Sequence, residues 1–141
     1  MQRLFLDTNI ILDLLGEREP FYDSTAKLVS LADRQKIMLV ASPISFATVS
    51  YFLTKYETAD IAKEKLRKFK VICNVCILDE TILEKSLNST FKDFEDALQY
   101  YSALGASCDL IITRNGKDFK KASIPVMTTD EYLKKYMLIS K

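Results

Sequence analysis

The sequence predicts a three-layer α/β protein, in which a roughly five-stranded parallel sheet carries helices on both faces. Two observations support this fold class: short apolar runs alternate with longer amphipathic segments, and no linker, repeat or low-complexity tract interrupts the alternation. Parallel neighbours require crossover connections, which the intervening helices supply. A chain of 141 residues has the size of one ordinary domain, so we expect residues 1–141 to form a single domain.

The apolar runs are the expected strands. They cover residues 3–6, 37–41, 75–78, 110–113 and 125–128. The uninterrupted run at 37–41 is typical of a strand that is covered on both faces, as the central strands of a parallel sheet are.

The segments between these runs are the expected helices. They cover residues 8–15, 22–34, 43–56, 58–69, 80–87, 93–104 and 130–138. Ser42 and Pro43 predict a helix start, as N-cap and first helical residue, and Gly105 predicts a helix end. On the second helix, the residues expected to face inward are Ala26, Val29, Ser30 and Ala32.

The composition removes several classes of chemistry. The chain has no histidine, which excludes Ser-His-Asp and Cys-His catalysis and histidine metal ligands. Any reaction must depend on carboxylates, hydroxyls, amides, lysines, thiols or a bound ion. The net charge of +1 gives no overall basic field, so nucleic-acid binding would depend on a local arrangement of charge.

The start of the chain resembles neither a secretory signal nor a membrane anchor. Asp7 follows the apolar start at once, and Asp13 interrupts the next apolar run. No apolar stretch has the length that a bilayer requires. We therefore expect a cytoplasmic protein without a membrane partner, whose Cys73, Cys76 and Cys108 are reduced, structural thiols.

Acidic and amide side chains gather at one edge of the predicted sheet, where strands end and the following helices begin. Asp7 ends the first strand, Asp93 and Asp96 lie in the first turn of the helix before the fourth strand, and Asn115 and Asp118 follow that strand. Ligands bind at this edge in open α/β sheets. Each residue also has a structural explanation, because Asp caps helices and Asn and Asp form turns.

Two further residues help to define this edge. Thr48, in the second turn of the helix that starts at Pro43, lies near it, whereas Asp109 precedes the fourth strand and belongs to the opposite edge. Carboxylates that lie close together repel one another, and a cation relieves the repulsion. Oxygen ligands favour Mg²⁺ or Mn²⁺ over zinc.

Three motifs occur in order along the chain. They are Leu6-Asp7-Thr8-Asn9-Ile10, then Asp93-Phe94-Glu95-Asp96-Ala97-Leu98-Gln99, then Ile112-Thr113-Arg114-Asn115 with Asp118-Phe119. Over nearly the whole chain, their order and spacing resemble the PIN-domain family and its VapC-like toxin ribonucleases. The resemblance implies a metal-dependent endoribonuclease that hydrolyses RNA, often as the toxin of a toxin–antitoxin pair. Expected partners are RNA, an antitoxin protein and a second copy of the chain.

The resemblance also implies roles for the acidic edge. Asp7 and Asp96 would hold Mg²⁺ or Mn²⁺, while Asn115 and Asp118 would position the attacking water. Thr48 stands where the family has a Glu, so the site has one negative charge fewer. A hydroxyl can still coordinate Mg²⁺ or orient its water.

Other polar residues near the edge are expected to assist. Asn9 and Asp93 would support the ligands through hydrogen bonds. Arg114 and Lys117 are the expected contacts to RNA phosphates, with Arg18 as a further candidate.

Two other functions stay open. The loss of the Glu at Thr48 favours a catalytically degenerate PIN-like module that binds RNA or a protein. A phosphoryl-transfer domain with a nucleophile at Asp7 would need a second Asp two residues later, where the chain has Asn9.

Overall fold

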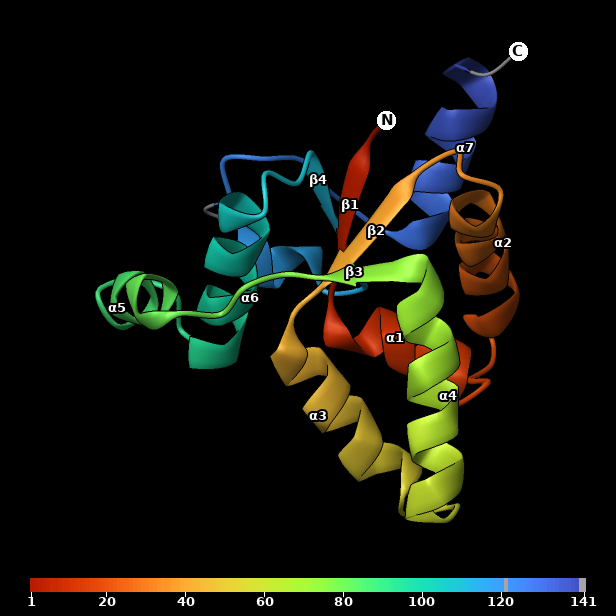
Figure 1. Ribbon diagram of the computed structural model, residues 1–141. Helices are drawn as coiled ribbons and strands as arrows, with labels where there is room; N and C mark the ends of the chain where they lie inside the picture. Colours follow the sequence, from red (N-terminus) through yellow and green to blue (C-terminus); the bar gives the residue numbers. More distant parts are fainter. Residues whose placement is uncertain (121, 140–141) are drawn as a thin grey trace.

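Five parallel strands form the sheet of the computed structural model, which describes residues 1–120 and 122–139 (Figure 1). They are β1 (Arg3–Leu6), β2 (Met38–Ala41), β3 (Cys73–Val75), β4 (Leu110–Ile112) and β5 (Val126–Met127). Their order is β3-β2-β1-β4-β5, and each neighbouring pair is parallel. The winding reverses between β1 and β4, which is where such sheets bind ligands at the carboxyl ends of the strands.

Helices cover both faces of the sheet. They are α1 (Thr8–Leu15), α2 (Tyr22–Asp33), α3 (Pro43–Leu53), α4 (Ala59–Ile72), α5 (Glu80–Leu87), α6 (Phe94–Gly105) and α7 (Thr129–Ile139), with a short 3₁₀ helix, η1 (Gly116–Phe119). One face is covered by α1 to α4 and α7, and the other by α5, α6 and η1 (Figure 1). The predicted three-layer fold is confirmed.

Alternation along the central strands explains the two layers of core. Leu4 and Leu6 point into the cluster beneath α1 to α4, while Phe5 between them packs against the α6 side. On β4, Ile111 and Ile112 divide between the two faces in the same way. Each of these side chains is at most 1% exposed, as expected for strands covered on both faces.

Local signals place most helix starts correctly. Ser42 caps α3, and its Oγ accepts a hydrogen bond from the Ile44 N–H at 3.2 Å. Thr58 caps α4 in the same way through the Ile61 N–H. Among the described residues, no helix has both the length and the apolarity that crossing a bilayer would require. Cys73 and Cys108 are buried and Cys76 is partly buried, all as free thiols.

Three local predictions are wrong. The third strand covers Cys73–Val75 instead of 75–78, because α4 continues to Ile72 and Cys73 pairs with Leu39 of β2. The helix α3 ends at Leu53, three residues before the predicted end. The inner side of α2 is formed by residues 25, 28 and 31, so Ser30, which was expected inside, is exposed.

Candidate active site

Asp7 occupies the centre of the predicted acidic edge. Its Oδ1 accepts from the Thr8 N–H at 2.9 Å, which caps α1, and its Oδ2 accepts from the Thr113 hydroxyl at 2.8 Å. The residue is only 7% exposed. Burial raises the pKa of Asp7 above its ordinary value, although the hydrogen bonds from Thr113 and Thr8 oppose this effect. The two hydrogen bonds thus fix the orientation of the carboxylate.

A buried network of hydroxyl and amide groups supports the Asp7 segment from behind. The Thr8 and Ser45 hydroxyls lie 2.8 Å apart, and the Gln99 amide Nε2 donates to both, at 3.1 and 2.8 Å. This network joins α1, α3 and α6. These three residues are not among the predicted site residues. The signal for them in the sequence is Gln99 in the apolar stretch of α6, since a buried amide needs partners.

Asp96 lies in the first turn of α6, where Asp93 caps the helix by accepting from the Asp96 N–H at 3.0 Å. Partial burial and, in decreasing order, the negative charges of Asp93, Asp7, Asp118 and Glu95 together raise the pKa of Asp96 from its ordinary value of 3.8 to about 7. Burial and the charges of Asp93 and Asp7 also raise the pKa of Glu95. Three segments that are distant in sequence therefore bring their carboxylates within mutual electrostatic reach.

The loop after β4 completes this edge. The Asn115 N–H donates to the Thr113 hydroxyl at 3.0 Å, which ties this loop to the hydroxyl that holds Asp7. Asp118 and Lys117 lie exposed on η1. They line a groove of about 380 Å³ together with Thr90, Phe91, Lys92, Asp93, Asp96 and Lys120. Carboxylates and lysines thus line the same groove.

Thr48 and Asn9 lie near the site without taking part in its hydrogen bonds. Thr48 is partly buried on α3, one turn after Ser45 and hence on the same side of the helix. Asn9 is partly buried in the first turn of α1. Among residues 1–120 and 122–139, neither side chain makes a hydrogen bond, so their predicted roles depend on a ligand.

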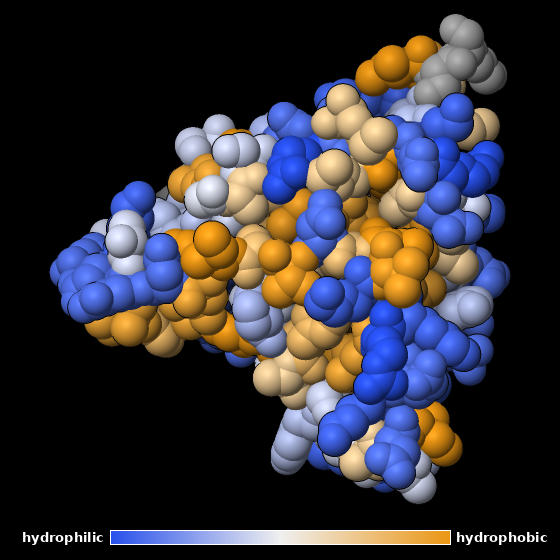
Figure 2. All heavy atoms as spheres, viewed as in Figure 1, coloured by the Kyte–Doolittle hydropathy of each residue, from blue (hydrophilic) through white to orange (hydrophobic). Residues whose placement is uncertain are grey.

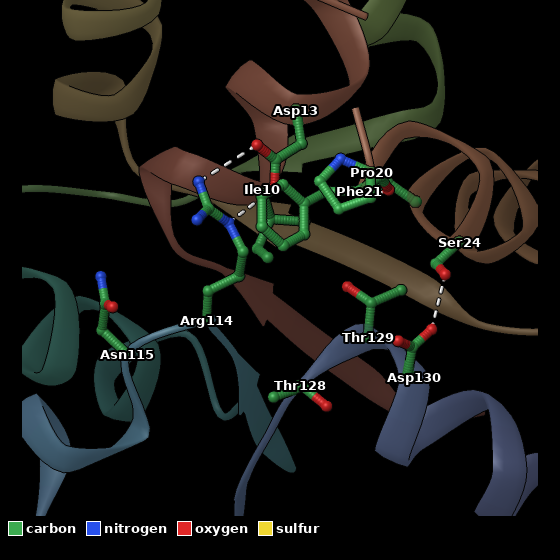
Figure 3. Close-up of a pocket in the computed structure, with 11 residues that line it drawn as sticks. Ile10, Asp13, Pro20, Phe21, Ser24, Arg114, Asn115, Thr128, Thr129 and Asp130 are labelled. Atoms are coloured by element: carbon green, nitrogen blue, oxygen red, sulfur yellow. Dashed lines mark hydrogen bonds and ion pairs between the residues drawn. The ribbon is translucent and has the colours of Figure 1, made fainter. Parts of the chain in front are cut away.

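The side chain of Arg114 is paired with Asp13 inside the protein, whereas the sequence predicts that it contacts an RNA phosphate. Its Nε and Nη2 donate to the two oxygens of Asp13 at 2.9 and 3.2 Å, and its guanidinium lies 4.0 Å from the centre of the Phe21 ring (Figure 3). Asp13 is fully buried on α1. The sequence signal for this pairing is the position of Asp13 inside the apolar run 10–15, because a buried charge requires a partner. Arg18, also proposed for RNA, lies 3.9 Å from the same carboxylate.

Asp109 lies at the edge of the sheet opposite to Asp7. Its carboxylate accepts from the Arg3 N–H at 2.7 Å, at the start of β1 and hence at the opposite end of the sheet from Asp7. The predicted separation of Asp109 from the acidic edge is correct.

The donor set of the acidic edge fits Mg²⁺ or Mn²⁺. Asp7 and Asp96 supply carboxylate oxygens whose raised pKa values reflect burial and repulsion, both of which a cation would relieve. In the part of the chain that the structure describes, no three acidic or thiol side chains converge into a finished ligand set. Two carboxylates completed by hydroxyl, amide and water oxygens suit Mg²⁺, which usually keeps several waters.

The crowding around Asp96 predicts that Asp96→Asn stabilises the metal-free protein at pH 8. The pKa of Asp96 is about 7 in the folded chain and 3.8 ordinarily, so its contribution to stability falls as the pH rises between these values. The variant should gain on the order of 1–2 kcal/mol at pH 8, after allowance for solvent screening, and almost nothing at pH 4. Urea unfolding in EDTA measures the gain in unfolding free energy at both pH values. An equal gain at the two pH values would refute the electrostatic cause.

Comparison with known proteins agrees with this geometry. The sequence model of the PIN domain matches residues 3–117. Ribonuclease VapC1 of Aquifex aeolicus (strain VF5) is 29% identical over 143 residues, which cover 96% of this chain and 96% of that protein.

Solved structures show the same architecture. A chain of a toxin-antitoxin complex from Klebsiella pneumoniae is 25% identical with a TM-score of 0.67, over 89% of this chain and 97% of that one. A chain of VapBC2 from Rickettsia felis, bound to a DNA fragment from their promoter, has a TM-score of 0.66 over the same shares, at 18% identity. The family match spans most of the sequence and contains Asp7, Asp96 and Asn115. The chain therefore belongs to the PIN domain family.

Proposed function

We propose that this protein is a Mg²⁺- or Mn²⁺-dependent endoribonuclease that acts as the toxin of a toxin–antitoxin pair. The observation that carries the proposal is the acidic edge, where burial and neighbouring carboxylates raise the pKa values of Asp7 and Asp96 around a position that a cation would occupy. The similarity to ribonuclease VapC1 over nearly the whole chain supports the same reaction class.

In this mechanism, Asp7 and Asp96 hold the ion. A bound Mg²⁺ or Mn²⁺ supplies Lewis-acid polarisation of a phosphoryl oxygen and a water of lowered pKa. Thr113 fixes the orientation of Asp7 by donating to its Oδ2, while the Thr8 N–H fixes Oδ1. Asp118 and Asn115 would orient the attacking water. The chain has no histidine, so these oxygen and amide groups do this work.

Local positive charge holds the RNA. Lys92, Lys117 and Lys120 line the same groove as Asp96 and Asp118, and phosphates bound by these lysines would place the backbone over the carboxylates. Arg114 is not counted among these phosphate contacts, because its guanidinium is already bound to Asp13. These lysines supply local positive charge beside the carboxylates in a chain whose net charge is only +1.

A binding module without catalysis is the second candidate, and Thr48 is the observation that favours it. Thr48 is uncharged and makes no hydrogen bond within residues 1–120 and 122–139. A site that has lost one carboxylate binds a divalent ion less tightly. RNA binding by the lysine groove would then persist without turnover.

We propose an antitoxin protein as the partner of this chain in a cytoplasmic setting. The Klebsiella pneumoniae structure, which has the same fold, is a toxin-antitoxin complex. Apolar side chains are exposed where α5 extends from α6, including Ile77, Leu83, Leu87 and Phe94 (Figure 2). Large exposed apolar patches mark sites where protein partners dock. A second copy of the chain could bind through the same surface, so the homodimer stays a prediction.

A nuclease assay tests the reaction directly. Purified protein is incubated with single-stranded RNA in Mg²⁺, in Mn²⁺ and in EDTA, and products are resolved on a sequencing gel. We expect internal cleavage with either ion and none in EDTA. RNA binding without cleavage in all three buffers would support the binding module instead.

Thr48→Glu should strengthen the site. The side chain lies on the same side of α3 as Ser45 and is only partly buried, so a longer polar group has room to reach the carboxylate edge. We expect about tenfold tighter Mn²⁺ binding by calorimetry and faster RNA cleavage, since one added carboxylate contributes roughly 1–2 kcal/mol to ion binding. Thr54→Glu, at the exposed end of the same helix, is the matched control and should change neither. A wild type that never cleaves RNA, beside an active Thr48→Glu variant, would establish the degenerate reading.

A further inference from the structure

A second cavity lies beside the acidic edge, between α1, α2, the end of β4 and the start of α7 (Figure 3). Its volume is about 290 Å³. This is the lower limit of ligand pockets, so the cavity suits a single flat ring system and is too small for a whole nucleotide with its phosphate.

The walls of this cavity combine apolar side chains with a paired charge, and Asp130 adds an exposed carboxylate that accepts a hydrogen bond from the Ser24 hydroxyl. Ile10, Pro20 and Phe21 line it, and the guanidinium of Arg114 lies 4.0 Å from the Phe21 ring centre. Both oxygens of Asp13 hold that guanidinium, so its charge is compensated and its plane is fixed. Fixed guanidinium planes and aromatic rings are the surfaces on which unstacked RNA bases lie.

An unpartnered hydroxyl faces the cavity. Thr129 is only 7% exposed, and its Oγ1 has no hydrogen-bond partner among residues 1–120 and 122–139. In Figure 3 this oxygen points towards the side that Arg114 and Phe21 form. A hydroxyl both donates and accepts, and leaving one buried without a partner is unfavourable. A ligand with a hydrogen-bonding edge would satisfy it.

Hydrogen bonds connect the cavity to the acidic edge. Asn115 lines the cavity, and its N–H donates to the Thr113 hydroxyl, which in turn donates to Asp7. Arg114, which lines the cavity, lies between Thr113 and Asn115 in the sequence. A group bound in the cavity is therefore adjacent to whatever binds at Asp7.

We propose that this cavity holds one base of the RNA substrate, next to the phosphate that is cleaved, and that Thr129 selects the base by hydrogen bonding to its edge. A flat, neutral ring with donors and acceptors on its rim is the ligand that matches these walls. The inference rests on the proposed function, because it takes RNA as the substrate at Asp7. It assigns base preference to α7 and Arg114, outside the acidic edge.

The first test detects the cavity without the reaction. The four ribonucleosides, which carry no phosphate, are titrated in EDTA against protein labelled at the Ile and Thr methyl groups. We expect the NMR signals of Ile10 and Thr129 to shift on binding. The dissociation constant of the nucleoside that binds most tightly should be at least about tenfold lower than that of the weakest one. Absence of shifts with all four nucleosides at millimolar concentration would overturn the proposal.

The second test changes the selecting group. Thr129→Val keeps the shape of the side chain and removes only an unsatisfied hydroxyl, so the variant should unfold at the wild-type temperature or above it. We expect its base preference at the cleavage site, measured as the ratio of the cleavage rates of the most and least preferred RNA, to fall about tenfold. Thr54→Val, which removes an exposed hydroxyl at the end of α3, should keep the wild-type preference.

The outcomes separate this inference from the proposed function. If Asp7→Asn abolishes cleavage but Thr129→Val retains the wild-type base preference, the cavity is not a base subsite and the ribonuclease proposal stands. If no RNA is cleaved but a nucleoside binds wild type and not Thr129→Val, the cavity recognises bases and the ribonuclease proposal fails. Nucleoside binding that Thr129→Val does not weaken would overturn the assignment of Thr129.

Discussion

Asp7→Asn should reduce metal-dependent RNA cleavage about a thousandfold while the fold is retained. Asp7 is the most buried carboxylate of the acidic edge, and the variant removes its charge from the ion. Loss of several kcal/mol of transition-state stabilisation corresponds to a factor of this size. Asn is itself a good N-cap, and its side-chain oxygen can still accept from the Thr8 N–H, so α1 should remain capped.

The measurement is a single-turnover cleavage rate together with calorimetric Mn²⁺ binding and a circular dichroism spectrum. Asp109→Asn is the matched control, because it makes the same chemical change at the opposite edge of the sheet. It should cleave RNA at the wild-type rate. Equal activity of Asp7→Asn and wild type, both folded, would remove Asp7 from the site.

Arg114→Met should destabilise the protein by about 3–5 kcal/mol, since it leaves a buried carboxylate without its partner. Asp13 is 0% exposed and accepts two hydrogen bonds from Arg114. Burial already raises the pKa of Asp13, and Arg114 is the main group that opposes this effect. The variant should therefore hold Asp13 as the neutral acid over a wider pH range.

The pH dependence of that loss identifies its cause. Without Arg114, the folded-state pKa of Asp13 rises further above the unfolded value of 3.8, so the stability of the variant falls as the pH rises through the folded-state pKa. Urea unfolding should show a smaller loss at pH 5 than at pH 8. The double variant Asp13→Leu/Arg114→Met should recover most of the stability at both pH values, because apolar groups replace buried ion pairs well. A loss under 1 kcal/mol for Arg114→Met would instead mark Arg114 as a surface residue available for RNA.

The sequence by itself determined the features that depend on neighbouring residues. The alternation of apolar runs and helices predicts the parallel sheet, and the cap residues Ser42, Asp93 and Asp7 lie where their helices begin. Because strand ends share one edge in such a sheet, the gathering of Asp7, Asp96 and Asp118 and the exclusion of Asp109 also follow from the order of elements alone.

Only the tertiary structure decided which distant side chains meet. Asp13 and Arg114 lie 101 residues apart, and the Gln99 amide reaches Ser45 across 54. Buried polar groups need partners, but the partner depends on strand order and on the rotation of each helix about its axis. That rotation also faces Thr25 inward on α2 and leaves Ser30 outside. The acidic edge thus follows from the order of the elements in the sequence, whereas the pairing of Arg114 with Asp13 and the place of Thr129 in the wall of a cavity are decided by long-range packing.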